Sequence, residues 1–357
     1  MTERKLASIR RIKEIREIPG ADRIVCAVVD GWELVTQKAN NFKPGDLVVY
    51  FEIDSLLPIC DQFSFLEQYR VSAKNSVNGE GYRLKTIKLR GQISQGLILP
   101  LEEALSGLQK VVDVNTYAPV WLFGGEVIMP EEGVDLTEYL GIKKYEKPIP
   151  AQLAGRIRGN FPSFIRKTDQ ERIQNCFDKW FDKWKDHEFE VTLKLDGSSF
   201  TAYVTEERFG VCSRNLDLIE TEDNTFWQVA RKYDLENKMK AIGYSFAIQG
   251  ELMGPGVQGN RERFEELDIY IFDIFDIEKQ RYVGAFERWE LCEKLGLKHV
   301  PIIDVSEFHF TSVKEFLRYA ERPSINHKQA EGVVFKSISN PDISFKAISN
   351  AFLMDEE

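Results

Sequence analysis

The first hundred residues consist of short apolar runs separated by turn-forming residues. The run Ile24 to Val29 follows the sequence Pro19-Gly20-Ala21-Asp22, and Lys43-Pro44-Gly45-Asp46 precedes a second run from Leu47 to Ile53. Proline, glycine and aspartate favour turns because they accommodate the backbone angles that tight turns need. Short strands at regular spacing with turns between them predict a small β-barrel or β-sandwich.

The segment from Tyr82 to Leu101 alternates apolar residues with basic ones. The apolar positions are Leu84, Ile87 and Leu89, and the basic ones are Arg83, Lys85, Lys88 and Arg90. Two interpretations are open. The segment could be a barrel strand whose basic face follows a phosphate backbone, or a half-buried strand whose charged face is simply solvated.

Prolines interrupt the pattern in the middle of the chain. Pro119, Pro130, Pro148 and Pro150 fall there, and proline cannot donate a backbone hydrogen bond within a helix or a sheet. We therefore expect a first domain over residues 1–115, a linker over 116–160 and a second domain over 161–357.

The second half opens with a helical pattern. Thr168 and Glu171 are spaced as a capping box, and apolar residues follow at helical spacing at Ile173, Phe177, Trp180, Phe181 and Trp184. We interpret most of these side chains as core packing.

A strand pattern follows the helix, with Phe189, Val191 and Leu193 on one face of Glu188 to Lys194. A second strand is expected from Ser199 to Thr205. Further strands are expected at 244–250, 268–275, 331–336 and 343–348, with a helix near 284–296. This succession predicts an α+β domain built on antiparallel sheets.

Composition adds limits to this picture. The 357 residues are 43% hydrophobic and 29% charged, as in a globular protein, and no apolar run is long enough to span a membrane. The start of the chain is charged, with no apolar signal region behind it. Five scattered cysteines show no paired spacing, which argues against a disulfide framework or a structural zinc site. We expect a protein of the reducing cytoplasm, with no membrane partner.

The net charge of −10 is unevenly distributed. Residues 1–160 hold 21 basic and 21 acidic side chains, whereas residues 161–357 hold 26 and 36. A global field that attracts nucleic acid is therefore absent, and any binding of nucleic acid must depend on a local patch. The acidic second half remains compatible with an enzyme whose carboxylates serve metal ions.

The central candidate for chemistry is Lys194-Leu195-Asp196-Gly197, where a lysine ends a strand just before a turn. Taken alone, Asp-Gly indicates no more than a hairpin turn. Further motifs follow it in order, and each alone could be structural. They are Cys212-Ser213-Arg214-Asn215, Gly250-Glu251-Leu252, Ile271-Phe272-Asp273, Glu331-Gly332-Val333-Val334-Phe335-Lys336 and Ser344-Phe345-Lys346.

In this order and spacing, the set resembles the signature of the covalent nucleotidyltransferases, which include ATP- and NAD-dependent ligases and mRNA capping enzymes. Lys194 to Gly197 match the nucleophile motif, and the resemblance runs from about residue 160 to the end. The first hundred residues resemble the N-terminal OB domain of the nick-sealing RNA ligases, notably at Asp30-Gly31-Trp32, Tyr50-Phe51-Glu52-Ile53-Asp54 and Lys85 to Gly96. The implied fold is α+β, an N-terminal OB-fold β-barrel followed by an antiparallel-sheet nucleotidyltransferase domain.

The resemblance also implies roles for individual residues. Lys194 would attack ATP and carry AMP, while Lys336 and Lys346 would contact the α-phosphate. Position 348 is isoleucine, where the family often has a second lysine. The implied nucleotide contacts are Phe272 on adenine, Arg214 on ribose and backbone groups of Thr192 and Leu193 on the adenine edge. The implied ligands of Mg²⁺ or Mn²⁺, directly or through water, are Asp196, Glu251 and Glu331, with Glu251 and Glu331 also near the nucleotide.

The implied activity is ATP-dependent joining of RNA 3′-OH and 5′-phosphate ends, with duplex nicks as the expected substrate. DNA ligase and capping enzyme are the alternatives within the superfamily, and an inactive nucleic-acid-binding adaptor is the alternative outside it. The sequence 254–259 satisfies G-x-G-x-x-G, but no long helix is expected after it, so a dinucleotide-binding unit is disfavoured. The oligomeric state is left open.

Overall fold

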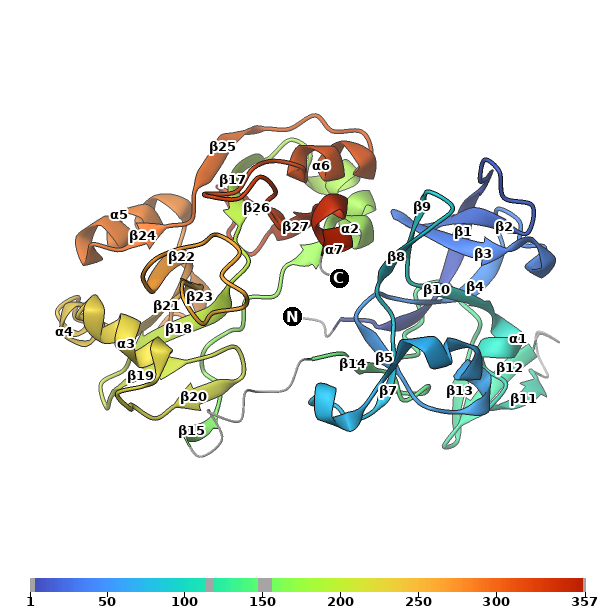
Figure 1. Ribbon diagram of the computed structural model, residues 1–357, viewed down its shortest axis with the longest axis horizontal. Coiled ribbons are helices and arrows are strands. Elements are labelled where there is room, and N and C mark those ends of the chain that lie inside the picture. The colour runs from blue at the N-terminus through green and yellow to red at the C-terminus, as the bar shows by residue number, and fades with distance from the viewer. Residues whose placement is uncertain (1–3, 114–118, 147–155, 356–357) are drawn as a thin grey trace. The chain divides into compact units, whose positions relative to one another are not determined.

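The computed structural model describes residues 4–113, 119–146 and 156–355. The chain divides into two compact units, unit 1 over Met1–Pro150 and unit 2 over Ala151–Glu357. Figure 1 colours unit 1 from blue to green and unit 2 from green to red. Among the described residues, no helix is long and apolar enough to cross a membrane.

Unit 1 is built on a five-stranded antiparallel sheet in the order β10-β4-β1-β2-β3. The strands are β1 (Ala7–Glu17), β2 (Ile24–Val29), β3 (Trp32–Gln37), β4 (Leu47–Phe51) and β10 (Leu97–Pro100). The predicted turn before Ile24 and the strand after it are confirmed. Gly96 leads into β10 with φ +111°, and a Cβ there would lie 2.4 Å from the Phe51 carbonyl oxygen. Only glycine fits where the chain closes against β4.

The segment Tyr82 to Leu101 differs from the single alternating pattern expected. It forms the end of β7 (Gly81–Arg83), a hairpin of β8 (Thr86–Leu89) and β9 (Gln92–Gln95), and then β10. Arg90 and Gly91 have φ +49° and +85°. Left-handed angles at both residues reverse the chain, which the alternation of apolar and basic residues does not reveal.

The rest of unit 1 consists of two small sheets and short helical turns. One sheet has the order β14-β5-β7-β6 and the other β11-β12-β13. Their strands are β5 (Ser55–Leu57), β6 (Arg70–Val71), β11 (Gln109–Val112), β12 (Pro119–Phe123), β13 (Glu126–Ile128) and β14 (Lys143–Lys144), and the helical turns are η1 (Lys38–Asn40), η2 (Asp61–Tyr69), η3 (Ala73–Asn75) and α1 (Leu101–Ala104).

The predicted linker over 116–160 differs from the structure. Trp121, Ile128, Leu136 and Ile142 are buried in the core of unit 1, and β14 pairs with β5. At the other end of the segment, β15 (Ile157–Asn160) pairs with a strand of unit 2. Burial of large apolar side chains outweighs the local effect of the prolines. The parts of the prediction at 116–118 and 147–155 lie outside the described residues.

Unit 2 contains two sheets. The larger has the order β15-β20-β19-β18-β21-β22-β23, with β24 beside β22. Its other strands are β18 (Ser198–Val204), β19 (Phe209–Cys212), β20 (Leu216–Leu218), β21 (Phe246–Met253), β22 (Asp268–Asp276), β23 (Arg281–Tyr282) and β24 (Lys298–His299). Its apolar side packs against α3 (Thr225–Lys232), α4 (Leu235–Lys240) and α5 (Ala285–Leu295).

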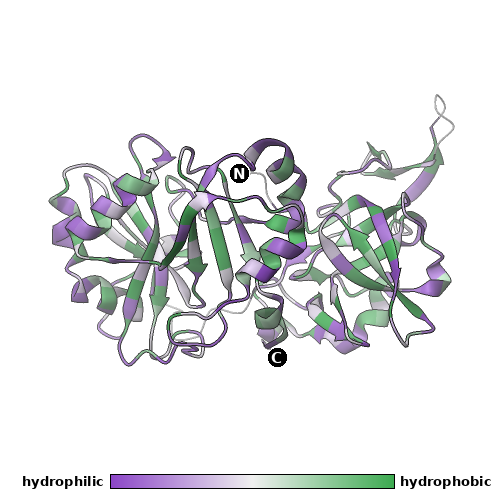
Figure 2. Cartoon of the chain, turned by 90° about the horizontal axis from the view of Figure 1, so that it is seen from above, coloured by the Kyte–Doolittle hydropathy of each residue, from purple (hydrophilic) through white to green (hydrophobic). Residues whose placement is uncertain are grey.

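The second sheet of unit 2 has the order β16-β27-β26-β17-β25. Its strands are β16 (Glu171–Arg172), β17 (Glu188–Lys194), β25 (Ile302–Glu307), β26 (Gly332–Ser337) and β27 (Ser344–Ile348). Helices α2 (Ile173–Lys179) and α6 (Val313–Ala320) cover its apolar face, and α7 (Asn350–Asp355) follows β27. Figure 2 shows apolar stretches running through the strands, with polar residues gathered in loops. The α+β class and the expected strands of this half are confirmed.

The helix at the start of unit 2 begins later than the predicted capping box. Its N-cap is Arg172, and no side chain caps it. Glu171 and Arg172 instead form β16, which pairs in parallel with Phe345 and Lys346. Pairing with β27 holds this backbone extended, so tertiary contacts override the local signal. The helix becomes a π-helical turn over Trp180–Trp184; Trp180 is fully buried, but Phe181 is 45% exposed and is not a core residue.

Candidate active site

Lys194 lies where the chain crosses from one sheet of unit 2 to the other. It is the last residue of β17, which pairs with β25 and β26, whereas β18 pairs with β19 and β21. Asp196-Gly197 is therefore not a hairpin turn but a crossover. A Cβ on Gly197 would lie 2.4 Å from the Leu252 carbonyl oxygen, so the motif needs glycine for close packing against β21.

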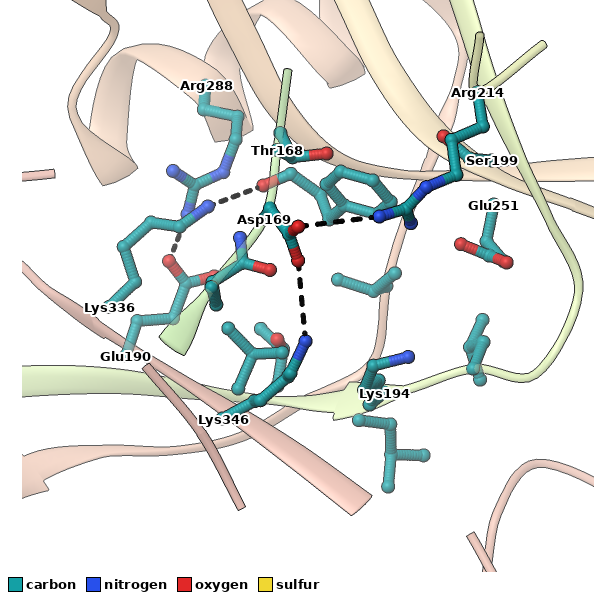
Figure 3. Close-up of a pocket in the computed structure, with 17 residues that line it drawn as sticks. Thr168, Asp169, Glu190, Lys194, Ser199, Arg214, Glu251, Arg288, Lys336 and Lys346 are labelled. Carbon is teal, nitrogen blue, oxygen red and sulfur yellow. Dashed lines mark hydrogen bonds and ion pairs between the residues drawn. The ribbon is translucent and has the colours of Figure 1, made fainter. Parts of the chain in front are cut away.

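The alternation of β17 presents Glu190, Thr192 and Lys194 to a cavity between the two sheets. Across the second sheet, Lys194 lies opposite Gly332, and Thr192 lies in one row with Val334 and Lys346. Directly opposed residues of antiparallel strands share a face. The second sheet therefore supplies Lys346 to the same cavity as Lys194 (Figure 3).

The larger sheet supplies the opposite wall. Ser199, Glu251 and Phe272 come from β18, β21 and β22, and Arg214 comes from the loop after β19. Of the predicted nucleotide-contacting residues, Lys194, Lys336, Lys346, Thr192, Leu193, Arg214, Glu251 and Phe272 all line this one cavity. Asp196 and Glu331 adjoin it through their electrostatic interactions with Lys194.

Lys194 is surrounded by carboxylates. Its Nζ donates a hydrogen bond of 2.6 Å to Glu331 Oε2, and Glu251 Oε1 accepts one of 3.1 Å from the Gly197 amide. Burial lowers the pKa of Lys194, but the negative charges of Glu331, Glu251 and Asp196 outweigh it and raise that pKa above its ordinary value. The chain's own groups therefore hold the amine protonated, which is the form that cannot attack.

The same cluster contains more carboxyl groups than the single Lys194 ammonium can neutralise. Burial, together with the charge of Glu331, raises the pKa of Glu251 to about 8, although Lys194 acts against this shift. Charge of this kind is suited to a cation. Yet no group of three or more His, Cys, Asp or Glu side chains within the described part of the chain could hold a metal ion.

Lys336 lies at the other end of the cavity. Its Nζ donates to the Phe272 carbonyl at 2.9 Å and pairs with Asp273. It lies four positions after Gly332, which is opposite Lys194, and four positions span roughly 13 Å along a strand. Burial lowers its pKa, against the charge of Asp273. The Lys336 amine is therefore held by residues of β22. Lys346 is nearer to Lys194, because it lies only two residues along its strand from the position in register with Lys194.

Several cavity residues were not anticipated from the sequence. Glu190 pairs with the buried Arg288 of α5 and accepts a hydrogen bond of 3.2 Å from the Trp289 indole. Glu190 could have been found, because it shares the alternation of Thr192 and Lys194. Arg288 carried no signal, since helical charges are usually exposed. The remaining unanticipated lining residues are Thr168, Asp169, Gln170, Leu195, Ser199, Val300 and Val334.

Comparison with known proteins identifies the family. A model of an OB-fold domain matches residues 6–101, and a model named RNA ligase matches residues 187–348. A solved structure of Naegleria gruberi RNA ligase with PPi is 41% identical, with 99% of each chain covered and a TM-score of 0.85. The chain belongs to the RNA ligase family.

Two further structures of the Naegleria enzyme are similar to this chain to the same degree. A mutant with ATP and Mn is 41% identical, with 98% of each chain covered and a TM-score of 0.85. An apo mutant is 40% identical, with 100% of this chain and 99% of that chain covered and a TM-score of 0.86. No curated protein matches this chain. The predictions of an N-terminal OB fold and of an RNA ligase enzyme are confirmed, and the family match goes against the alternatives of DNA ligase, capping enzyme and inactive adaptor.

Proposed function

We propose that this RNA ligase transfers AMP from ATP to Lys194 and uses it to seal RNA-containing nicks in duplexes. The observation that carries the proposal is the position of Lys194 at the crossover between two sheets, with Glu331 at 2.6 Å. A lysine held there can face a nucleotide in the cavity on one side and the carboxylates on the other.

Names of the Naegleria structures support the assignment. They describe mutants of a lysine, of an aspartate two residues after it and of a glutamate 57 residues after it, several of them with ATP or AMP and Mn. Lys194, Asp196 and Glu251 have the same spacing. A further glutamate and lysine are 14 residues apart there, and Glu331 and Lys346 are 15 apart here. Five residues of the same types thus recur in the same order.

Activation of Lys194 follows from the charge around it. Asp196, Glu251 and Glu331 would hold a hydrated Mg²⁺ or Mn²⁺, which supplies positive charge beside the amine and favours its neutral form. The Lys194 amine gives up its proton and forms a bond to the α-phosphorus of ATP. The bond from that phosphorus to the bridging oxygen breaks, and pyrophosphate leaves with the electron pair.

The walls of the cavity position the nucleotide. Phe272 is available to stack on adenine, Arg214 to contact the ribose, and the backbone of Thr192 and Leu193 to read the adenine edge. We assign the α-phosphate contact chiefly to Lys346, since Lys336 is held by Asp273. Ile348 is 3% exposed at the end of β27, so a second lysine is replaced there by a packed apolar side chain.

The remaining steps use the ends of the nucleic acid. A 5′-phosphate oxygen attacks the phosphorus of lysyl-AMP and releases Lys194. A 3′-hydroxyl then attacks the adenylylated 5′-phosphate, forms the phosphodiester bond and expels AMP. Each step exchanges one bond to phosphorus for another, so no further co-reactant is needed.

The test of this proposal uses ATP labelled at the α-phosphate, with Mg²⁺ or Mn²⁺. We expect the wild-type chain to keep the label through denaturing electrophoresis and Lys194→Ala to lose it entirely, because alanine has no amine. Labelled GTP serves as the nucleotide control. Nicked duplexes and single strands, each with an RNA or a DNA 3′-end, then define the substrate.

Two outcomes would contradict the proposal. Label on Lys194→Ala would place the nucleophile elsewhere, and no label on the wild-type chain with either metal would remove the lysyl-AMP step. Joining of single strands in preference to nicks would overturn the substrate assignment alone.

A further inference from the structure

The segment Thr168 to Gln170 lines the nucleotide cavity, although no catalytic or binding role was expected for it. Within it, the Asp169 carboxylate lies between cations from the two sheets. Oδ2 is 3.5 Å from Arg214 Nη2, and Oδ1 is 3.6 Å from Lys346 Nζ (Figure 3). One carboxylate thus links a side chain on each wall of the cavity.

In the proposed function, Asp169 lies between the residue assigned to the ribose, Arg214, and a residue assigned to the α-phosphate, Lys346. In the proposed function, Phe272 contacts the base, while Lys194 and Lys346 contact the α-phosphate. The ribose connects base to phosphate, so it must lie between these groups. Asp169 reaches Lys346 with one oxygen and Arg214, the proposed ribose contact, with the other.

The other carboxylates lining the cavity are engaged elsewhere. Glu190 is buried against Arg288, and Glu251 accepts from Gly197 and faces Lys194. Asp169 differs because its side chain is 46% exposed and two cations compensate its charge. An ionised carboxylate accepts hydrogen bonds from hydroxyl groups and repels phosphate. The diol of ribose is the part of ATP that fits this chemistry.

We propose that Asp169 accepts a hydrogen bond from the ribose diol of ATP and thereby selects nucleotides with an intact ribose. The proposal rests on the proposed function, and it assigns selectivity for the sugar to a residue outside the nucleotidyltransferase motifs. A hydrogen bond to a charged acceptor typically changes binding by about tenfold when the donor is removed.

The experiment measures the rate of lysyl-AMP formation with ATP, 2′-deoxy-ATP and 3′-deoxy-ATP. We expect the wild-type chain to prefer ATP over at least one deoxy analogue by about tenfold. Asp169→Ala should bring that ratio to within about twofold, mainly by raising KM for ATP. Asp169→Asn should retain part of the selectivity, because its amide oxygen still accepts a hydrogen bond.

Glu171→Gln is the matched control. Glu171 lies two residues along the same segment, and its Oε1 accepts from Asn175 Nδ2 at 2.7 Å outside the cavity. This variant should keep the wild-type ratio. Equilibrium binding of the three nucleotides to Lys194→Ala, with and without Asp169→Ala, gives the same comparison without the covalent step and shows that the chain still folds and binds.

The possible outcomes separate this inference from the proposed function. No labelling of the wild-type chain overturns the proposed function. Labelling of the wild-type chain with an unchanged ATP to deoxy-ATP ratio in Asp169→Ala overturns this inference alone, since a purely structural role weakens all three nucleotides equally. An equal fall in KM for all three nucleotides in Asp169→Ala also overturns this inference. Asp169 would then only compete with the phosphate of the nucleotide for Lys346.

Discussion

At the scale of the residue, the carboxylates around Lys194 favour the protonated form of its amine, whereas the proposed reaction needs the neutral form. Lys194 needs a neutral amine, yet Glu331, Glu251 and Asp196 raise its pKa. The same carboxylates are the natural ligands of a hydrated divalent cation, which would reverse the effect. In the proposed mechanism, the ion pair of Lys194 with Glu331 keeps the amine protonated until a cation binds.

A residue-scale prediction concerns His299, which accepts a hydrogen bond of 3.0 Å from Arg288 Nε. Burial and the charge of Arg288 lower the pKa of His299 from 6.5 to about 4. The unfolded chain binds a proton between these values that the folded chain does not. The free energy of unfolding should therefore fall by about 3 kcal/mol as the pH falls from 6.5 to 4.

Urea unfolding at several pH values measures this dependence. His299→Gln should flatten it over that pH window, because glutamine can accept the Arg288 hydrogen bond but does not titrate. His309→Gln, at an exposed position, is the control. An unchanged slope in His299→Gln would show that other groups dominate acid sensitivity.

At the scale of the element, strand β17 links the site to the core. Its apolar face packs Phe189 and Val191 under α2 and α6, while its other face presents Glu190, Thr192 and Lys194 to the cavity. Helix α5 reaches the same strand through Arg288 and Trp289, which both contact Glu190. The position of Lys194 thus depends on contacts from both sides of one strand.

An element-scale prediction follows for Glu190. Glu190→Ala leaves the Arg288 guanidinium buried without its carboxylate, and Arg288 is only 1% exposed. Removing one partner of a buried ion pair typically costs about 3–5 kcal/mol. Urea unfolding at pH 7 should show a loss of this size, whereas Glu188→Ala, exposed on the same strand, should change stability by less than about 0.5 kcal/mol. A loss below about 1 kcal/mol in Glu190→Ala would contradict the assigned role of the pair.

At the scale of the whole molecule, the two units have separate cores. The core of unit 1 draws on residues between Leu6 and Ile142, and the cores of unit 2 on residues between Ile165 and Ala347. All residues lining the nucleotide cavity belong to unit 2. The OB-fold domain is therefore not needed to build the nucleotide cavity.

The prediction at this scale concerns a fragment of residues 151–357. We expect it to form lysyl-AMP at a rate within about tenfold of the full chain, since it contains the complete cavity and its own cores. Sealing of a nicked duplex should fall by more than tenfold, because phosphate contacts from an OB fold supply affinity for nucleic acid. Circular dichroism checks folding; a folded fragment that takes no label would show that unit 1 contributes to adenylylation.

The sequence by itself determined the family, the order of the motifs and most of the strands. Lys194, Arg214, Glu251, Phe272, Glu331 and Lys346 could be named in advance because their motifs resemble the nucleotidyltransferase signature in order and spacing. The face of β17 that carries Lys194 also followed from alternation, since the side-chain period of a strand is local geometry.

Only the tertiary structure decided how these residues meet. The crossover at Asp196-Gly197, the commitment of Lys336 to Asp273 and the position of Asp169 between Arg214 and Lys346 each join segments far apart in the chain. Pairing of β16 with β27 forms a strand where a capping box was expected. Burial of apolar side chains makes much of the expected linker part of the core of unit 1. Such contacts depend on long-range packing. The free energy of that packing exceeds local conformational preferences, and it produces no motif at a fixed spacing in the sequence.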